Sequence, residues 1–149
     1  MTRPDGDLAG RKLMQGKVFL DTNVIIYLFS IKDEAKKARA FDVINENNCV
    51  TSIQAINEST NVWLKKFGMN SKTIASLLES IELICDDILS VQRETIESAI
   101  LLHERYGFSY FDCLMLASAL EGDCDIIFTE DMNNGQVINE TLKIVNPFA

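Results

Sequence analysis

Histidine and paired cysteines, the usual ligands of zinc, are almost missing from this sequence. Its single histidine is His103, and four cysteines stand apart in apolar surroundings with no C-x-x-C pair: Cys49, Cys85, Cys113 and Cys124. Because zinc sites of the usual kind need several Cys or His ligands at short spacings, such a site is not expected. Isolated thiols are typical of a reducing compartment, so we expect a cytoplasmic protein.

Long apolar runs are missing as well. No segment approaches the roughly 20 apolar residues that span a bilayer, and the opening MTRPDGDLAGRK lacks the apolar stretch of a signal peptide. The phosphate-loop pattern G-x-x-x-x-G-K, the dinucleotide pattern G-x-G-x-x-G and the hydrolase pattern G-x-S-x-G do not occur. The sequence therefore gives no support to a membrane protein, a nucleotide-binding loop or a serine hydrolase of that type.

Positive charge is scarce, with 14 Lys and Arg against 22 Asp and Glu and a net charge of −8. This balance argues against a protein that coats nucleic acid, because phosphate contacts are made mainly by Lys and Arg. It leaves open a nuclease that brings divalent cations to the phosphate. Between Tyr106 and Ala149 the only basic residue is Lys143, whereas the acidic residues there are Asp112, Glu121, Asp123, Asp125, Glu130, Asp131 and Glu140.

What is present is enough apolar material for one domain: 47% of the 149 residues are hydrophobic. Residues 1–16 predict a flexible extension, and residues 17–149 a single domain. Short strands are predicted at 18–21, 49–52, 83–85 and 125–129, with 143–148 as a possible fifth, and helices fill the intervals. This alternation predicts an α/β fold with a central parallel sheet of four or five strands and helices on both faces.

Two of these helices have predicted inward faces. In the helix over 32–48, Ala38, Phe41 and Ile44 are expected to face the core. In the next helix, Ser52 is a plausible N-cap, and Ile53 and Trp63 belong to the predicted apolar stripe.

Acidic residues follow two of the predicted strands. Asp21 ends the run VFLD before a helix, and Glu130 and Asp131 follow DIIFT. The carboxyl ends of parallel strands are where open α/β sheets bind ligands, so these acids are candidates for a site. The alternative for Asp21 alone is a helix N-cap.

Asp112 is the most informative acid, because Met115, Leu116 and Ala119 follow it at helical spacing and place its carboxylate on an apolar face. A carboxylate in such surroundings needs a partner, and a purely structural hydrogen bond is the alternative to a functional role. Glu58 lies away from the predicted apolar stripe of its helix, and by itself it would be a solvated surface residue.

The sequence resembles PIN domains, and among them the VapC-like toxins of toxin–antitoxin pairs. The matching segments occur in the family order: FLDTNVII at 19–26, INE at 56–58, YFDCLMLASAL at 110–120, FTEDMNNG at 128–135 and KIVNPF at 143–148. Each is weak alone, whereas the five in order are specific. The stretch before Val18 is longer than in typical members, which leaves Met1 or Met14 as the natural start.

The resemblance implies a three-layer α/β/α fold, endoribonuclease activity that depends on Mg²⁺ or Mn²⁺, and a homodimer that works as the toxin of a type II pair with an antitoxin protein. It assigns catalysis and metal binding to the same four acids, Asp21, Glu58, Asp112 and Asp131. Supporting polar groups would be Thr22, Asn23, Thr129 and Glu130. It does not tell whether one or two metal ions bind.

The residue types suit this chemistry. Carboxylates that converge repel one another, and a hard dication with a preference for oxygen ligands relieves the repulsion. Phosphodiester hydrolysis at such a site needs no protein nucleophile. For the RNA substrate, Lys32, Lys36 and Arg39 form a candidate basic stripe, although an ordinary solvated helix face is the alternative.

Two other functions remain open at this point. A phosphatase of the haloacid-dehalogenase kind would use an aspartate after the first strand, but that family normally has a second aspartate where this chain has Asn23. A non-catalytic PIN-like binding module is the other alternative. The presence of all four acids argues against it, and an RNA cleavage assay would separate it from an enzyme.

Overall fold

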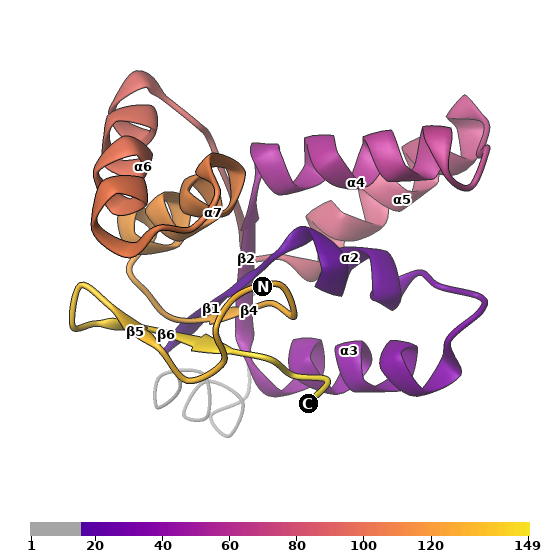
Figure 1. Cartoon of the computed structure of the whole chain (residues 1–149). Coiled ribbons are helices and arrows are strands. Elements are labelled where there is room, and N and C mark those ends of the chain that lie inside the picture. The colour runs from indigo at the N-terminus through magenta and orange to yellow at the C-terminus, as the bar shows by residue number, and fades with distance from the viewer. Residues whose placement is uncertain (1–15) are drawn as a thin grey trace.

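The computed structural model describes residues 16–149, so the extension predicted over residues 1–16 lies outside the described range except for Gly16. Strands and helices alternate along the chain (Figure 1). The strands are β1 (Lys17–Leu20), β2 (Asn48–Ser52), β3 (Asp87–Leu89), β4 (Cys124–Phe128), β5 (Val137–Ile138) and β6 (Leu142–Val145). The helices are α2 (Thr22–Leu28), α3 (Glu34–Glu46), α4 (Ile53–Lys65), α5 (Ser71–Ile84), α6 (Arg93–Tyr106) and α7 (Tyr110–Glu121).

The strands form one sheet in the order β3-β2-β1-β4-β6-β5. All pairings are parallel except that of β5 with β6. Helices α6 and α7 cover one face, and α2, α3, α4 and α5 cover the other (Figure 1). The predicted α/β/α fold with a mostly parallel sheet is therefore confirmed. The parallel strands number five, within the predicted four or five, and the antiparallel β5 was missed because its two residues leave no periodic signal.

The sheet order places a topological switch point beside β1. From β1 the chain passes to β2 and β3 on one side, and it then returns to β4 on the other side of β1. The strand order therefore switches direction between β1 and β4, and the carboxyl ends of strands at such a switch point are where open α/β sheets bind ligands. Leu20 pairs with Phe128, so Asp21 and Thr129 are the next residues along adjacent strands.

The core explains the position of the site. Val18, Phe19 and Leu20 of β1 are buried, and so is every residue of α7 from Cys113 to Ala119. A helix that is apolar all round has to be enclosed, so α7 is packed between α6 and the sheet. Only its first turn, which carries Asp112, reaches the carboxyl edge of the sheet.

None of the helices within residues 16–149 combines the length and apolar character required to cross a bilayer.

The predicted inward faces of two helices were right only in part: Ile44 packs against the core and Trp63 is buried, but other predicted residues are exposed. In α3 the buried residues are Ala40 and Val43, whereas Ala38 is exposed and the Phe41 side chain is 48% exposed. In α4 the buried residues are Ala55, Ser59 and Trp63, and Ile53 is exposed. Both helices carry apolar residues on more than one side, so contacts with the rest of the fold decide which side is enclosed.

The strand predicted at 83–85 was also misplaced. Helix α5 continues through Ile84 with Leu83 87% exposed, and β3 begins at Asp87. Asn70 caps the start of this helix, with its Oδ1 accepting from the Thr73 amide at 2.9 Å. A three-residue strand directly after a helix gives the sequence no room for an alternating pattern.

Candidate active site

Asp21 is the buried centre of the candidate site. It follows β1 and caps α2, with Oδ1 accepting from the Thr22 amide at 2.7 Å and Oδ2 accepting from the Thr129 hydroxyl at 2.7 Å. Its side chain is buried, with 3% of the residue exposed. Burial raises the pKa of Asp21 to about 7; the bonds from Thr129 and Thr22 oppose this rise, and the charges of Asp112 and Asp131 add to it.

Asp131, in the loop after β4, is held by Asn23 of α2. The Asn23 amide nitrogen donates to Asp131 Oδ2 at 2.8 Å and to the Thr129 hydroxyl at 3.3 Å. The Asn23 carbonyl oxygen accepts from the Glu130 amide at 3.3 Å, and the Asp131 amide donates to the Thr129 hydroxyl at 3.1 Å. Asn23 thus binds both the backbone and the carboxylate of the loop after β4.

Glu58 reaches the site from the second turn of α4. Its Oε1 accepts from the Thr22 hydroxyl at 3.3 Å, and its Oε2 accepts from Gln54 at 3.0 Å. Sequence reasoning missed Gln54, although its spacing of four residues from Glu58 on one helix is a visible signal. The contact with Thr22 joins α4 to the start of α2, next to Asp21.

Asp112 completes the group from the first turn of α7, which Ser109 caps by accepting from the Asp112 amide at 3.2 Å. Burial raises the pKa of Asp112, a hydrogen bond with Ser109 lowers it, and the charges of Asp131 and Glu58 raise it further. The four acids therefore share one electrostatic neighbourhood although they come from four separate segments. We call Asp21, Glu58, Asp112 and Asp131 the acid cluster.

The acid cluster offers only oxygen donors, which suits Mg²⁺ or Mn²⁺ and not zinc. Within residues 16–149, no three Asp, Glu, His or Cys side chains form a ready-made coordination group. Such a dication commonly takes one or two carboxylates and keeps several waters, so the residues present fit it without a complete protein cage. His103 lies in the last turn of α6, and its Nδ1 is 2.6 Å from the Phe108 carbonyl oxygen.

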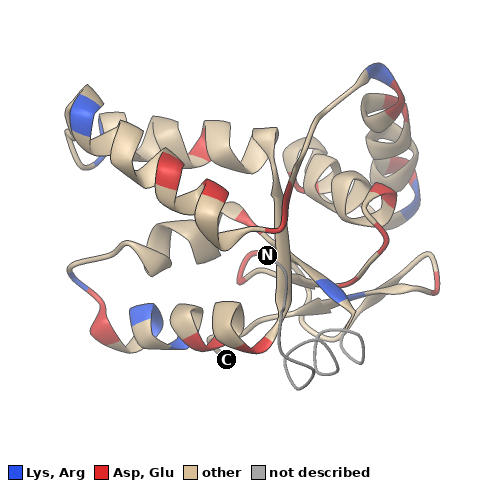
Figure 2. Cartoon of the chain, turned by 180° about the vertical axis from the view of Figure 1, so that it is seen from behind, with Lys and Arg blue, Asp and Glu red and all other residues tan. Residues whose placement is uncertain are grey.

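Other predicted residues lie elsewhere. Glu130, predicted to support the acid cluster, accepts instead from Lys36 and Tyr27. Lys32 precedes α3 rather than belonging to it, and the Arg39 Nε donates to the Pro147 carbonyl oxygen at 2.8 Å. The predicted stripe is therefore not a row of three free cations. Lys and Arg lie on α3, around the turn between α4 and α5, and on α6 (Figure 2).

The Thr129 hydroxyl gives a first testable prediction. We expect Thr129→Val to lower the free energy of unfolding by about 2 kcal/mol, because a buried carboxylate loses its side-chain donor. Thr51→Val is a matched control, since the Thr51 hydroxyl is equally buried but donates to the neutral Leu20 carbonyl oxygen at 2.8 Å. Its cost should be about 1 kcal/mol in urea unfolding. Equal costs would show that the Thr129 bond has no special importance for Asp21.

Fold and site together define an α/β/α protein with a cluster of carboxylates at the carboxyl edge of a parallel sheet. The family model of the PIN domain matches residues 18–136, which is most of the chain and includes all four acids. The chain belongs to the PIN domain family, as the resemblance of its motifs predicts.

Solved structures of similar fold include a chain of a toxin–antitoxin complex and a toxin. A chain of a toxin–antitoxin complex from Klebsiella pneumoniae is 20% identical, with 87% of this chain and 97% of that chain covered and a TM-score of 0.64. VapC20 from Mycobacterium tuberculosis, a sarcin–ricin loop cleaving toxin, is 17% identical, with coverage of 76% and 91% and a TM-score of 0.60. FitAcB from Neisseria gonorrhoeae is 18% identical, with coverage of 88% and 98% and a TM-score of 0.60. The sequence matches none of the curated proteins with which it was compared.

Proposed function

We propose that this protein is a metal-dependent endoribonuclease that hydrolyses RNA phosphodiester bonds and acts as the toxin of a type II toxin–antitoxin pair. The observation that carries the proposal is the acid cluster: the charges of Asp112 and Asp131 raise the pKa of Asp21, and those of Asp131 and Glu58 raise the pKa of Asp112. Thr22 joins Glu58 to Asp21 through hydrogen bonds. The two ion pairs recorded within residues 16–149, Lys36 with Glu130 and Arg93 with Glu97, include none of the members of the acid cluster. The negative charge is thus left for a cation from solution.

The residues have distinct tasks in this proposal. Asp21, held by two hydrogen bonds and excluded from water, gives a rigid anchor for Mg²⁺ or Mn²⁺. Asp131, Glu58 and Asp112 would complete the surroundings of the ion from the loop after β4, from α4 and from α7. When bound, the ion supplies Lewis-acid polarisation of the phosphate and activation of water. Thr22, Asn23 and Thr129 hold the carboxylates in place, and no side chain serves as nucleophile.

The proposed partners are an RNA substrate, an antitoxin protein and a second copy of the chain, all in the cytoplasm. The similarity to a chain of a solved toxin–antitoxin complex supports the antitoxin. Large apolar side chains exposed on several helices, with Leu64 at 52%, Leu83 at 87% and Leu101 at 65%, support contacts with other proteins.

The alternatives are weaker after the structure. The PIN assignment sets aside the haloacid-dehalogenase phosphatase, and Asn23, at the place of that family's second aspartate, donates a hydrogen bond to Asp131. A non-catalytic PIN-like module would not need a buried carboxylate whose ionisation burial opposes.

The direct test is cleavage of a mixed RNA substrate by the purified protein with Mg²⁺, with Mn²⁺ and with EDTA. We expect cleavage products with either metal, none with EDTA, and recovery when metal is restored. The absence of cleavage under all three conditions, with the protein folded and shown to bind RNA, would favour the binding module.

The basic residues give a second prediction. We expect Lys32→Gln with Arg39→Gln to weaken RNA binding and to flatten its dependence on salt by roughly 0.7 in slope for each lost contact with a single strand. Lys36→Gln alone should leave the slope unchanged, because its ammonium group is paired with Glu130. Fluorescence anisotropy with a non-cleaving variant measures both quantities. A flatter slope for Lys36→Gln would restore Lys36 to the RNA surface.

A further inference from the structure

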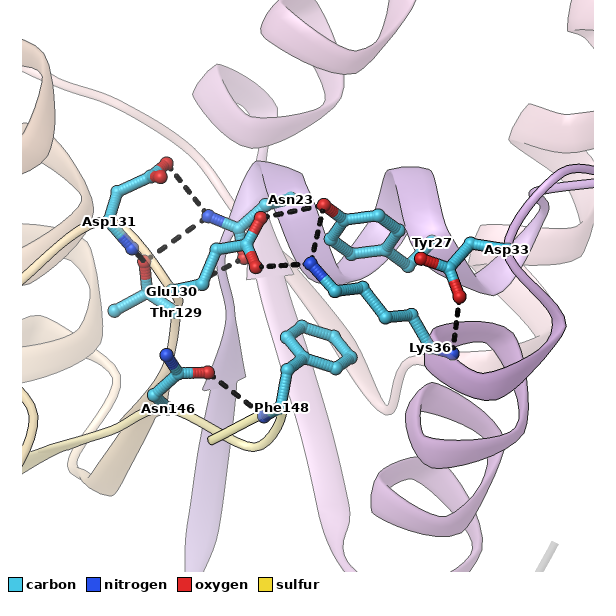
Figure 3. A network of polar contacts seen from close by, with 9 residues as sticks. All are labelled: Asn23, Tyr27, Asp33, Lys36, Thr129, Glu130, Asp131, Asn146 and Phe148. Atoms are coloured by element: carbon cyan, nitrogen blue, oxygen red, sulfur yellow. Dashed lines mark hydrogen bonds and ion pairs between the residues drawn. The ribbon is translucent and has the colours of Figure 1, made fainter.

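Glu130 and Asp131 are adjacent in sequence, but their carboxylates bind different partners (Figure 3). Asp131 points to Asn23 at the acid cluster, whereas Glu130 points to Lys36 and Tyr27. The loop after β4 thus carries two adjacent acids beside the other three carboxylates of the acid cluster, and only one of the two joins them. Contacts with Lys36 and Tyr27 hold the other acid, Glu130.

The Glu130 carboxylate is enclosed in a triangle of polar contacts (Figure 3). Lys36 Nζ donates to Glu130 Oε2 at 2.9 Å and to the Tyr27 hydroxyl at 3.0 Å, and that hydroxyl donates to Glu130 Oε1 at 2.8 Å. Both carboxylate oxygens are therefore occupied. Hydrogen bonds with Tyr27 and Glu130 raise the pKa of Lys36, so the cation stays charged at neutral pH.

Two aromatic rings lie against the Lys36 ammonium group. Lys36 Nζ lies 4.4 Å from the centre of the Tyr27 ring and 5.5 Å from that of Phe148, and these two rings meet edge to face at 5.0 Å. The side chains of Lys36 and Glu130 are 33% and 23% exposed, compared with 86% and 60% for the ion pair of Arg93 with Glu97 on α6. The first pair is thus confined by its surroundings, whereas the second is an ordinary surface pair.

We propose that Lys36 and Tyr27 are positioning residues of the acid cluster. They bind Glu130 and hold its carboxylate away from the other acids, so that Asp131 is the acid of this loop that belongs to the acid cluster. The proposal rests on the proposed function. An unpaired Glu130 would be a fifth carboxylate beside the acid cluster, able to compete with Asp131 for a cation and to hold it in an unproductive place. This role differs from an RNA contact, because it acts through Glu130.

The decisive experiment compares Lys36→Met with Lys36→Met combined with Glu130→Gln. Lys36→Met keeps the length of the side chain and removes its charge, and we expect kcat to fall about tenfold with little change in KM. We expect Mn²⁺ alone, titrated calorimetrically without RNA, to bind several-fold more tightly, because Glu130 is released. The double variant should return kcat and the Mn²⁺ affinity to within about twofold of wild type. Glu130→Gln alone should remain active, since its amide oxygen can still accept from Lys36.

Two further variants keep the test sharp. Tyr27→Phe retains the ring against Phe148 and removes only the hydroxyl, so it should lower kcat less than Lys36→Met and regain activity with Glu130→Gln. Arg93→Met is the control, because it breaks an ion pair far more exposed and should change neither kcat nor Mn²⁺ affinity.

Other results would overturn the proposal. If Lys36→Met and the double variant are equally impaired, with a raised KM, Lys36 contacts RNA and not the loop. If the Mn²⁺ affinity is the same in all variants, Glu130 does not join the acid cluster when it is released. The Mn²⁺ titration needs no substrate, so it still decides the positioning role if the wild-type protein proves to cleave no RNA.

Discussion

Asp112→Asn is expected to lower RNA cleavage by about a hundredfold or more while leaving the protein folded. The substitution keeps the size of the side chain, which sits in the first turn of α7 beside the fully enclosed residues of that helix. It removes one charge from a cluster in which Asp131 and Glu58 already oppose the ionisation of Asp112. Without metal, the variant should therefore melt at or above the wild-type temperature, which separates loss of chemistry from loss of fold.

The matched control is Asp42→Asn on α3, which makes the same chemical change at an exposed position. It should cleave RNA at the wild-type rate. His103→Ala should also be nearly neutral, because the histidine is exposed and contacts the Phe108 carbonyl oxygen instead of the acid cluster. Full activity of Asp112→Asn would remove this residue from the mechanism and leave the acid cluster wrongly drawn.

The sequence was most informative where topology leaves little freedom. Asp21 and Asp131 follow strands of a parallel sheet, and because the ends of neighbouring parallel strands share an edge, their approach could be predicted without coordinates. The structure adds that β1 and β4 are direct neighbours, with Asp21 donating its amide hydrogen to the Phe128 carbonyl oxygen at 3.1 Å. Asp112 could be predicted from the conflict between a carboxylate and the apolar helix face that carries it.

Side-chain direction was the part that the sequence did not determine. Glu130 and Asp131 have the same chemistry and neighbouring positions, and only the contacts from Lys36 and Tyr27 separate them. These contacts join residues about a hundred positions apart, as the separation between Lys36 and Glu130 of 94 positions shows. No local pattern reports such a pairing. The inward faces of α3 and α4 were predicted only in part for the same reason, since packing against other elements decides which apolar side is enclosed.

Stability should fall as pH rises when metal is absent, and a bound dication should cancel this fall. Burial raises the pKa of Asp21 from 3.8 to about 7, so the folded state holds the proton more tightly than the unfolded chain. The contribution of Asp21 is fully present below the unfolded pKa and is lost as pH rises through the folded one. Between about pH 5.5 and about pH 8.5, the free energy of unfolding in EDTA should decrease by on the order of 2 kcal/mol from this group.

Added metal should act most strongly at the alkaline end of this range, because it replaces the proton that Asp21 has lost. At about 100 times its dissociation constant, Mg²⁺ or Mn²⁺ should add about 2.7 kcal/mol and raise the melting temperature by several degrees. Asp21→Asn removes both effects at once: its stability in EDTA should vary less with pH, and it should gain little from metal. Asp112→Asn should gain less than wild type. Equal metal-induced shifts in wild type, Asp21→Asn and Asp112→Asn would mean that the ion binds away from the acid cluster, with Asp123 and Asp125 the next carboxylates to replace.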